Sequence, residues 1–136
     1  MPAARAILAE DEPLLREELA ELLARLWPEL AIVAQTADGI ATLQALEKHG
    51  PDILFLDINM PGMSGYAVAR EIRERRGPLA PLLIAISGAW KDNAEQRVAR
   101  DLGFDHYLRK PCEAGELVAL LDAFRRHARG EASGGK

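Results

Sequence analysis

The stretch from Asp52 to Gly65, DILFLDINMPGMSG, decides the fold of this chain. Its apolar run Ile53–Leu56 lies between Gly50-Pro51 and a cluster of Pro, Gly and Ser, and such an unbroken run predicts a strand buried on both faces. Asp57 stands where that strand ends, and ligands of open α/β sheets bind outside the carboxyl ends of the strands. We therefore expect Asp57 to take part in chemistry, with a helix beginning after the turn residues that follow it.

Apolar runs of strand length alternate with segments of helical period along the rest of the chain. The predicted strands are residues 5–9, 31–35, 53–56, 82–86 and 105–109, and the predicted helices are residues 13–26, 38–49, 66–76, 92–102 and 113–129. This alternation predicts an α/β fold, a single (βα)5 doubly wound parallel sheet with helices on both faces. We expect one domain over residues 1–129 and a disordered tail rich in Gly, Ser and Glu over residues 130–136.

The apolar positions of the first two helices indicate which side of each helix packs on the sheet. Residues three and four apart lie on the same side of a helix. The positions that follow this spacing are Leu15, Leu19, Leu22 and Leu26 in the first helix and Ile40, Leu43 and Leu46 in the second. We expect both sets to face the sheet.

Composition and charge exclude several classes of protein. With 17 basic and 21 acidic residues the net charge is -4, which gives no electrostatic attraction to nucleic acid or to an anionic membrane. No apolar run approaches the roughly 20 residues of a membrane span. The one cysteine, Cys112, cannot form an internal disulfide, which favours a reduced, cytoplasmic setting. We predict no direct nucleic-acid binding by this chain and no membrane association.

Polar side chains follow four of the predicted strands at their carboxyl ends. They are Glu10 and Asp11 after the first strand, Asp57 after the third, Ser87 after the fourth and Lys110 after the fifth. A parallel sheet brings these ends to one edge, so we expect the side chains to share a pocket. Neighbouring carboxylates repel one another, and a hard divalent cation with oxygen ligands keeps them ionised. The sequence therefore predicts a Mg²⁺ site.

The chemistry expected of that pocket is phosphoryl transfer. Asp11, Asp57 and the main-chain oxygen of Asn59 could complete a Mg²⁺ site that keeps room for phosphate oxygens. A carboxylate nucleophile such as Asp57 can accept a phosphoryl group as an acyl phosphate. Lys110 would neutralise charge on the phosphoryl oxygens, and Ser87 would donate a hydrogen bond.

Four motifs of the chain resemble the receiver domain of two-component response regulators, the CheY-like superfamily. They are ILAEDEP at 7–13, FLDINMPGMSG at 55–65, IAISG at 84–88 and YLRKP at 107–111, and the resemblance covers about residues 5–126. It implies a flavodoxin-like strand order, 2-1-3-4-5. It also implies a cis peptide bond between Lys110 and Pro111. The chain departs from the usual pattern at Glu10, where the family most often has aspartate, and at Cys112.

The same resemblance implies a role for each polar residue of the pocket. Asp57 would be the phosphoacceptor, and Mg²⁺ would be held by Glu10, Asp11, Asp57 and the backbone carbonyl of Asn59. Ser87 and Tyr107 would form the switch, and Lys110 would pair with the phosphate. The chain would then be a phosphoacceptor that catalyses only its own phosphorylation and dephosphorylation.

The expected function is to accept a phosphoryl group from a histidine kinase or phosphotransfer protein on Asp57 and to switch a partner-binding face. One alternative is an enzyme with an aspartyl intermediate, similar to haloacid-dehalogenase-type phosphatases, although those carry the nucleophile in a D-x-D pattern on the first strand. Another is a flavin-binding flavodoxin-like domain, which the acidic segment Glu10–Glu12 disfavours. A degenerate receiver acting as an interaction module also stays open.

The output is the least constrained part of the interpretation. Either a stand-alone receiver acts on an unknown output protein, or these residues belong to a longer regulator or hybrid kinase with an effector domain. Homodimerisation through the last two helices also remains open.

Overall fold

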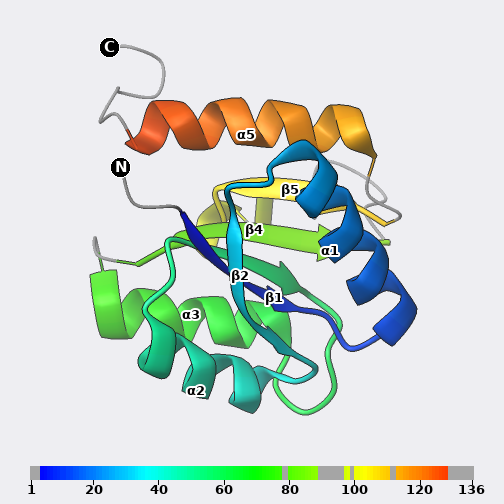
Figure 1. Cartoon of the computed structure of the whole chain (residues 1–136). Helices are drawn as coiled ribbons and strands as arrows, with labels where there is room; N and C mark the ends of the chain where they lie inside the picture. Colours follow the sequence, from blue (N-terminus) through cyan, green and yellow to red (C-terminus); the bar gives the residue numbers. More distant parts are fainter. Residues whose placement is uncertain (1–3, 78–79, 89–96, 99, 111–112, 129–136) are drawn as a thin grey trace.

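Five parallel strands form a single sheet in the order β2-β1-β3-β4-β5 in the computed structural model (Figure 1). The structure describes residues 4–77, 80–88, 97–98, 100–110 and 113–128. The strands are β1 (Arg5–Ala9), β2 (Ala31–Thr36), β3 (Ile53–Asp57), β4 (Leu82–Ser87) and β5 (His106–Arg109). The predicted parallel α/β sheet and its strand order are confirmed.

Helices connect the strands and lie on both faces of the sheet (Figure 1). They are α1 (Pro13–Leu26), α2 (Gly39–His49), α3 (Gly65–Arg76) and α5 (Ala114–Ala128). Residues 97–98 and 100–101, between β4 and β5, are also helical, and the turn ends at Gly103 with φ of 101°. The rest of the predicted helix 92–102, the Lys110–Pro111 peptide bond, Cys112 and the tail 130–136 lie outside the described residues.

Short polar side chains fix where two helices begin. The Asp38 carboxylate accepts the N–H of Ala41 at 2.7 Å at the start of α2, and the Ser64 hydroxyl accepts the N–H of Ala67 at 3.2 Å at the start of α3. Such caps satisfy amide donors that have no partner within the helix. The Ser64 cap also fixes where the loop after β3 ends, and that loop carries part of the site described below.

Alternate residues of the strands pack into two separate layers of core. Ile53 and Phe55 of β3 face α1 and α5, while Leu54 and Leu56 face α2 and α3. All of these side chains are fully buried. This is the packing expected of a central strand in a parallel sheet, and it explains why the β3 sequence shows no apolar-polar alternation.

Two details of the predicted helix faces are corrected. The buried centre of α1 consists of Leu19 and Leu23, so the predicted stripe missed Leu23, and Leu22 is only half-buried beside it. Ile40 was expected to face the sheet but is 60% exposed. It lies in the first turn of α2 and lines a surface groove with Met63 of the loop after β3, which takes it away from the sheet.

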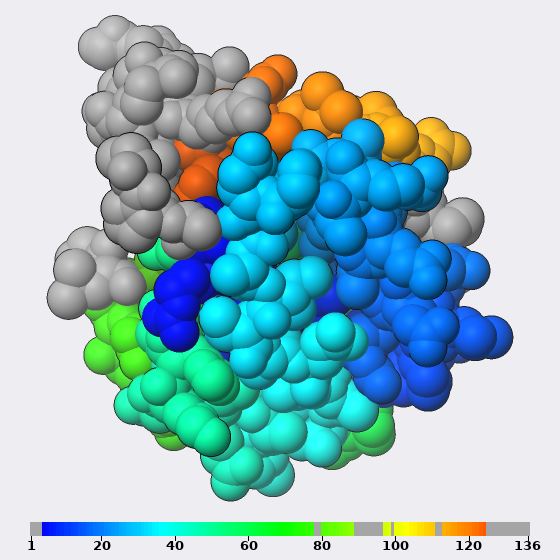
Figure 2. Space-filling view, viewed as in Figure 1, coloured from blue at the N-terminus to red at the C-terminus, as the bar shows by residue number. Residues whose placement is uncertain are grey.

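β2 is an edge strand, and its residues are exposed or half-buried. Figure 2 shows β2 in cyan on the near face of the molecule, beside α1 in blue.

No helix within the described ranges is long and apolar enough to cross a membrane.

Candidate functional site

The carboxyl ends of β1, β3, β4 and β5 bring the predicted polar residues to one edge of the sheet. In the sheet register Asp57 lies beside Ile86, the residue before Ser87. The Lys110 N–H donates to the Ser87 carbonyl at 3.2 Å, which ties the residue after β5 to the end of β4. Glu10, Asp57 and Ser87 are at most 4% exposed. We call this set, Glu10, Asp11, Asp57, Ser87 and Lys110, the carboxyl-edge site.

Asp57 lies at the base of the carboxyl-edge site and is fully buried. Its Oδ1 accepts the N–H of Asn59 at 3.0 Å and lies 3.2 Å from Lys110 Nζ. Its Oδ2 is also buried, and no donor in the described part of the chain bonds to it. A buried carboxylate oxygen without a hydrogen-bond donor lowers the stability of the folded protein. This oxygen is therefore suited to binding a cation.

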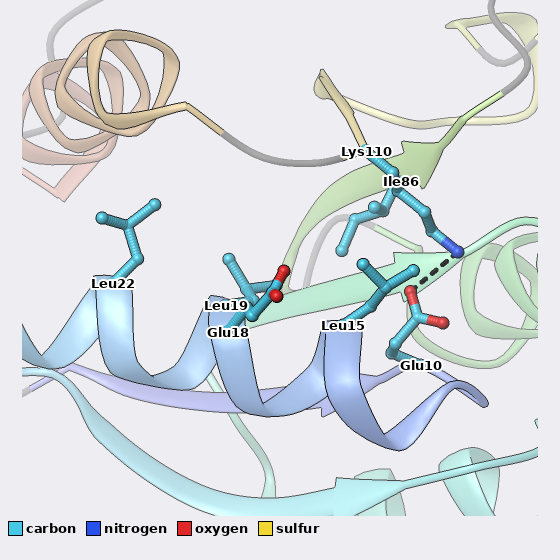
Figure 3. Close-up of a pocket in the computed structure, with 7 residues that line it drawn as sticks. All are labelled: Glu10, Leu15, Glu18, Leu19, Leu22, Ile86 and Lys110. Carbon is cyan, nitrogen blue, oxygen red and sulfur yellow. Dashed lines mark ion pairs between the residues drawn. The ribbon is translucent and has the colours of Figure 1, made fainter.

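Glu10 is held at three points. Its Oε1 lies 2.8 Å from Lys110 Nζ, and the dashed line in Figure 3 marks this ion pair. Its Oε2 accepts the N–H of Glu12 at 3.0 Å. Nη1 of Arg16 on α1 donates to the Glu10 carbonyl at 2.7 Å. No role for Arg16 was predicted, because a charged residue outside the apolar stripe of α1 gives no sign of this contact in the sequence.

Burial and neighbouring acids raise the pKa of Asp57 to about 7 from its ordinary 3.8. Burial is the largest cause, and the neighbouring Asp11 and Glu10 carboxyls add to it. The Asn59 amide and the Lys110 charge act in the opposite direction. For Lys110, burial alone would lower the pKa, but the hydrogen bond to Glu10 and the charges of Asp57 and Glu10 raise it above its ordinary value. Lys110 is therefore a cation at neutral pH.

The raised pKa of Asp57 predicts a pH-dependent gain in stability for Asp57→Asn in metal-free protein. Between about pH 4 and pH 7 the folded protein keeps a proton that the unfolded chain has released, so Asp57 lowers the free energy of unfolding as pH rises across this range. An asparagine side chain at this position has nothing to ionise. We expect the variant to be more stable than wild type by on the order of 2 kcal/mol at pH 8 and nearly equal at pH 4.

Urea unfolding at several pH values, with a chelator present, measures this difference. Glu17→Gln, which removes an exposed carboxylate on α1, is the matched control and should change stability by less than about 0.5 kcal/mol at either pH. A difference between Asp57→Asn and wild type that does not vary with pH would contradict the prediction.

Glu10, Asp11 and Asp57 each offer a carboxylate oxygen, and these oxygens lie within 4.8 Å of one another. When all three are ionised, the one ammonium leaves two of their negative charges uncompensated. Oxygen ligands in a partly hydrated setting suit a hard divalent cation, and Asp11 is half-exposed, so water can complete the coordination. The residues present therefore fit Mg²⁺.

The remaining predicted residues lie around the same edge. Asn59 is exposed directly after β3, with its N–H on Asp57. Tyr107 is half-buried on β5, beside Ala85 of β4, and packs against the core layer that contains Phe104. Thus every residue proposed from the sequence lies on a strand that reaches the carboxyl-edge site or on the segment that follows it.

Gly65 was not recognised from the sequence as part of the site. Its N–H donates to the Ile58 carbonyl at 2.9 Å, which folds the loop after β3 back onto the strand end. A Cβ at this position would lie 2.5 Å from the Asp57 carbonyl oxygen. The signal available in the sequence was a glycine directly after the helix cap Ser64, and such a glycine can mark a close approach of two backbone segments.

Fold and site together define a flavodoxin-like α/β domain with an acidic, lysine-paired site at the carboxyl edge of its sheet. The family model of the response regulator receiver domain matches residues 6–122, and the chain belongs to this family, the receiver domains of two-component response regulators.

Known proteins of this family are similar over most of the chain. An uncharacterized response regulatory protein of Vibrio cholerae is 42% identical over 124 residues, which are 91% of this chain and 46% of that protein. The signal receiver domain of the putative response regulator NarL from Mycobacterium tuberculosis is 31% identical, with a TM-score of 0.79 over 90% of this chain and 97% of that one.

A second similar structure contains a metal ion. The receiver domain of the sensor histidine kinase PA1611 from Pseudomonas aeruginosa, solved with a magnesium ion in its active-site cleft, is 26% identical. Its TM-score is 0.74, over 89% of this chain and 96% of that chain.

Proposed function

We propose that this receiver domain is a phosphoacceptor switch, with Asp57 receiving a phosphoryl group from a histidine kinase or phosphotransfer protein. The supporting observation is a buried carboxylate, Asp57, placed 3.2 Å from an ammonium at the edge of a parallel sheet, with one oxygen that no donor among the described residues contacts. The similarity to receiver domains supports a phosphohistidine as the phosphodonor. The chain is not expected to turn over a separate substrate.

In the proposed reaction a P–O bond to the Asp57 carboxylate forms as the P–N bond of the phosphohistidine breaks, and the imidazole leaves with the electron pair. The Asn59 amide fixes the orientation of the Asp57 carboxylate, and Lys110 supplies positive charge to the incoming phosphoryl oxygens. Mg²⁺ held by Asp11, Asp57, Glu10 and the Asn59 main-chain oxygen would add charge stabilisation of the same kind.

The switch would pass from the site to β4 and β5. A phosphoryl group on Asp57 offers acceptor oxygens to the hydroxyl of Ser87, which ends the neighbouring strand. Tyr107 lies one strand further on and is half-buried, so it can adopt a more buried position when Ser87 is drawn inward. Phosphorylation would then shift the population of the face formed by β5 and α5, which an output partner binds.

A pocket beside the site supplies apolar contacts for the partner that carries the phosphohistidine. Figure 3 shows Leu15, Leu19 and Leu22 in a row along α1, facing Ile86 of β4, with the Glu10–Lys110 pair at one end. Leu19 and Ile86 are buried in its floor, whereas Leu15 and Leu22 are half-buried, and partly exposed apolar side chains next to a reactive site favour a protein partner. Leu14, 74% exposed in the first turn of α1, adds to this surface.

The output of the whole protein is part of the proposal. The chain spans about half the length of the curated relatives it matches, 46% of the Vibrio protein and 55% of a transcriptional regulatory protein, PdtaR, of Mycobacterium tuberculosis. We propose that the switch acts on an output domain or on a separate protein, with a homodimer as a further state.

A cytoplasmic location suits a chain whose one cysteine has no partner for an internal disulfide.

Phosphorylation by a small-molecule phosphodonor with Mg²⁺ tests the proposal. Wild-type protein should gain one acid-stable, base-labile phosphate, seen by intact mass and mapped to Asp57, and Asp57→Asn should gain none. Asp52→Asn is the matched control, because Asp52 precedes the amino end of β3 and its carboxylate accepts the N–H of Arg5. It should be labelled like wild type. Equal labelling of Asp57→Asn and wild type would contradict the proposal. If neither protein were labelled, the result would favour an interaction module that acts without phosphorylation.

A further inference from the structure

Three residues fasten the segment before β5 to α3, at the amino edge of the sheet and away from the carboxyl-edge site. They are Arg73, in the last turn of α3, and Gly103 and Asp105, which lie between the helical residues 100–101 and β5. Arg73 Nη2 donates to the Gly103 carbonyl and lies 3.3 Å from Asp105 Oδ2. We call this set, Arg73, Gly103 and Asp105, the amino-edge clamp.

Asp105 joins the amino-edge clamp to the start of β4. Its carboxylate accepts the N–H of Leu83 at 2.8 Å, and its own N–H donates to the Leu83 carbonyl at 2.7 Å. The paired register of β4 and β5 begins one residue later, at Ile84 and His106. Asp105 and Leu83 therefore extend the pairing of the two strands by one residue, with a side-chain carboxylate as one of the acceptors.

The main chain of the clamp also fits closely against α3. Gly103 has φ of 101°, and a Cβ at this position would lie 2.9 Å from Arg73 Cγ. Phe104 is 3% exposed, and its ring meets that of Tyr66 on α3 edge to face, with 6.4 Å between the centroids. The side chains of Arg73 and Asp105 are 32% and 38% exposed, so their charges add little stability. The hydrogen bonds and the close packing hold the segment in place.

The two ends of β5 differ in what holds them. At the carboxyl end Lys110 lies 3.2 Å from Asp57, and esterification of Asp57 would remove the charge on that partner. None of the clamp contacts named above involves a residue of the carboxyl-edge site, so the reaction leaves them unaltered. At about 3.3 Å per residue, Asp105 and Lys110 lie about 16 Å apart along the chain. A displacement at the carboxyl end would therefore tilt β5 about its amino end.

We propose that Arg73 is a positioning residue that acts through Gly103 and Asp105, holding residues 103–105 as a fixed pivot when the carboxyl end of β5 moves. This inference rests on the proposed function and adds the point about which the switch turns. With the clamp intact, the movement is confined to the carboxyl end of β5. Without Arg73 the movement spreads to both ends of the strand.

The first test is hydrogen exchange of single amides, measured by NMR in metal-free protein without a phosphodonor. Arg73→Met keeps an apolar stem but removes the guanidinium, and it should speed exchange of the Leu83 and Asp105 amides about tenfold. The amide of Leu54, in the central strand β3, should change by less than about twofold. If Arg73→Met folds poorly, Arg73→Lys should show the same pattern to a smaller degree, because lysine lacks the forked donors that reach both partners.

Arg70→Met is the matched control, because it removes an exposed arginine one turn earlier in the same helix. It should leave all of these amides within about twofold of wild type. Unchanged exchange of Leu83 and Asp105 in both Arg73 variants would overturn the inference. So would equal acceleration at Leu54, because the substitution would then lower the stability of the whole fold and not release one end of β5.

The second test compares amide chemical shifts before and after phosphorylation by a small-molecule phosphodonor, with Mg²⁺ present in both samples. In wild type, residues 86–88 and 107–110 should shift, and residues 103–105 should shift several-fold less. In Arg73→Met the shifts should extend into residues 103–105, although intact mass should show the same extent of labelling as in wild type. A change in stability alone would not redistribute the shifts in this way.

The two samples also separate failure of the pivot from failure of the proposed function. If labelled wild type shows shifts at residues 103–105 as large as those at 107–110, the amino end of β5 is not fixed and the inference is overturned. If wild type is not labelled at all, the proposed function is contradicted. The exchange measurement, which uses no phosphodonor, then still decides whether Arg73 fixes this segment.

Discussion

Replacing Gly65 by alanine is expected to lower the free energy of unfolding by about 3 kcal/mol or more. The added Cβ would lie 2.5 Å from the Asp57 carbonyl oxygen and 2.7 Å from the Ile58 Cα. Both atoms belong to the backbone at the end of the central strand, so neither can move aside as the end of a flexible side chain could. Relief of the clash requires the loop after β3 to separate from the strand, which breaks the bond from the Gly65 N–H to the Ile58 carbonyl.

Urea unfolding of Gly65→Ala measures the loss, and the rate of phosphorylation should fall with it, because Asn59 and Asp57 belong to the same displaced segment. Gly115→Ala is the matched control. Gly115 lies in the first turn of α5, and a Cβ there would have no atom within 4 Å. This substitution should raise stability by about 0.5 kcal/mol, since alanine has less chain entropy to lose. Similar small changes in both variants would show that the loop accommodates a side chain at position 65.

The parts of the fold that sequence predicts well are those set by local patterns. β1 was predicted at residues 5–9 and is found there, because an apolar run bounded by polar residues has one simple explanation in a parallel sheet. The end of β3 is also predicted from local sequence, since Asp57 is the first polar residue after the buried apolar run. Strand topology then determines which distant residues meet, so the convergence of Asp57 and Lys110 follows from the order of the strands.

Contacts between elements leave no such pattern. The bond from Arg16 to the Glu10 carbonyl depends on how α1 leans over the end of β1, and no periodicity encodes that angle. The apolar pattern of α1 also missed Leu23, which lies at the buried centre of the helix face that contacts the sheet. That face is narrower than the apolar pattern suggests. The close approach at Gly65 is a property of two backbone segments, and the glycine after Ser64 is its one sign in the sequence.

The largest electrostatic effect is expected from Lys110→Met, which should destabilise metal-free protein by about 3 kcal/mol at pH 8. Methionine approximates the length of the lysine stem but carries no charge. Its introduction leaves the buried carboxylates of Glu10 and Asp57 without the ammonium, which lies 2.8 Å and 3.2 Å from them. Lys48→Met, at an exposed position in the last turn of α2, should change stability by less than about 0.5 kcal/mol.

The dependence of this loss on pH and Mg²⁺ identifies its cause. The pKa of Asp57 is about 7 even with Lys110 present, so Asp57 is protonated at pH 5 and has no charge for the ammonium to balance, and the loss should be smaller there. Mg²⁺ should recover most of the stability at pH 8, because it supplies the missing positive charge to the carboxylates. Adding Asp57→Asn to Lys110→Met should stabilise more than the same change does in wild type, since it removes a charge that has no partner. A loss that is the same at both pH values and unaffected by Mg²⁺ would mean that Lys110 stabilises the fold through packing of its stem, and that its charge contributes little.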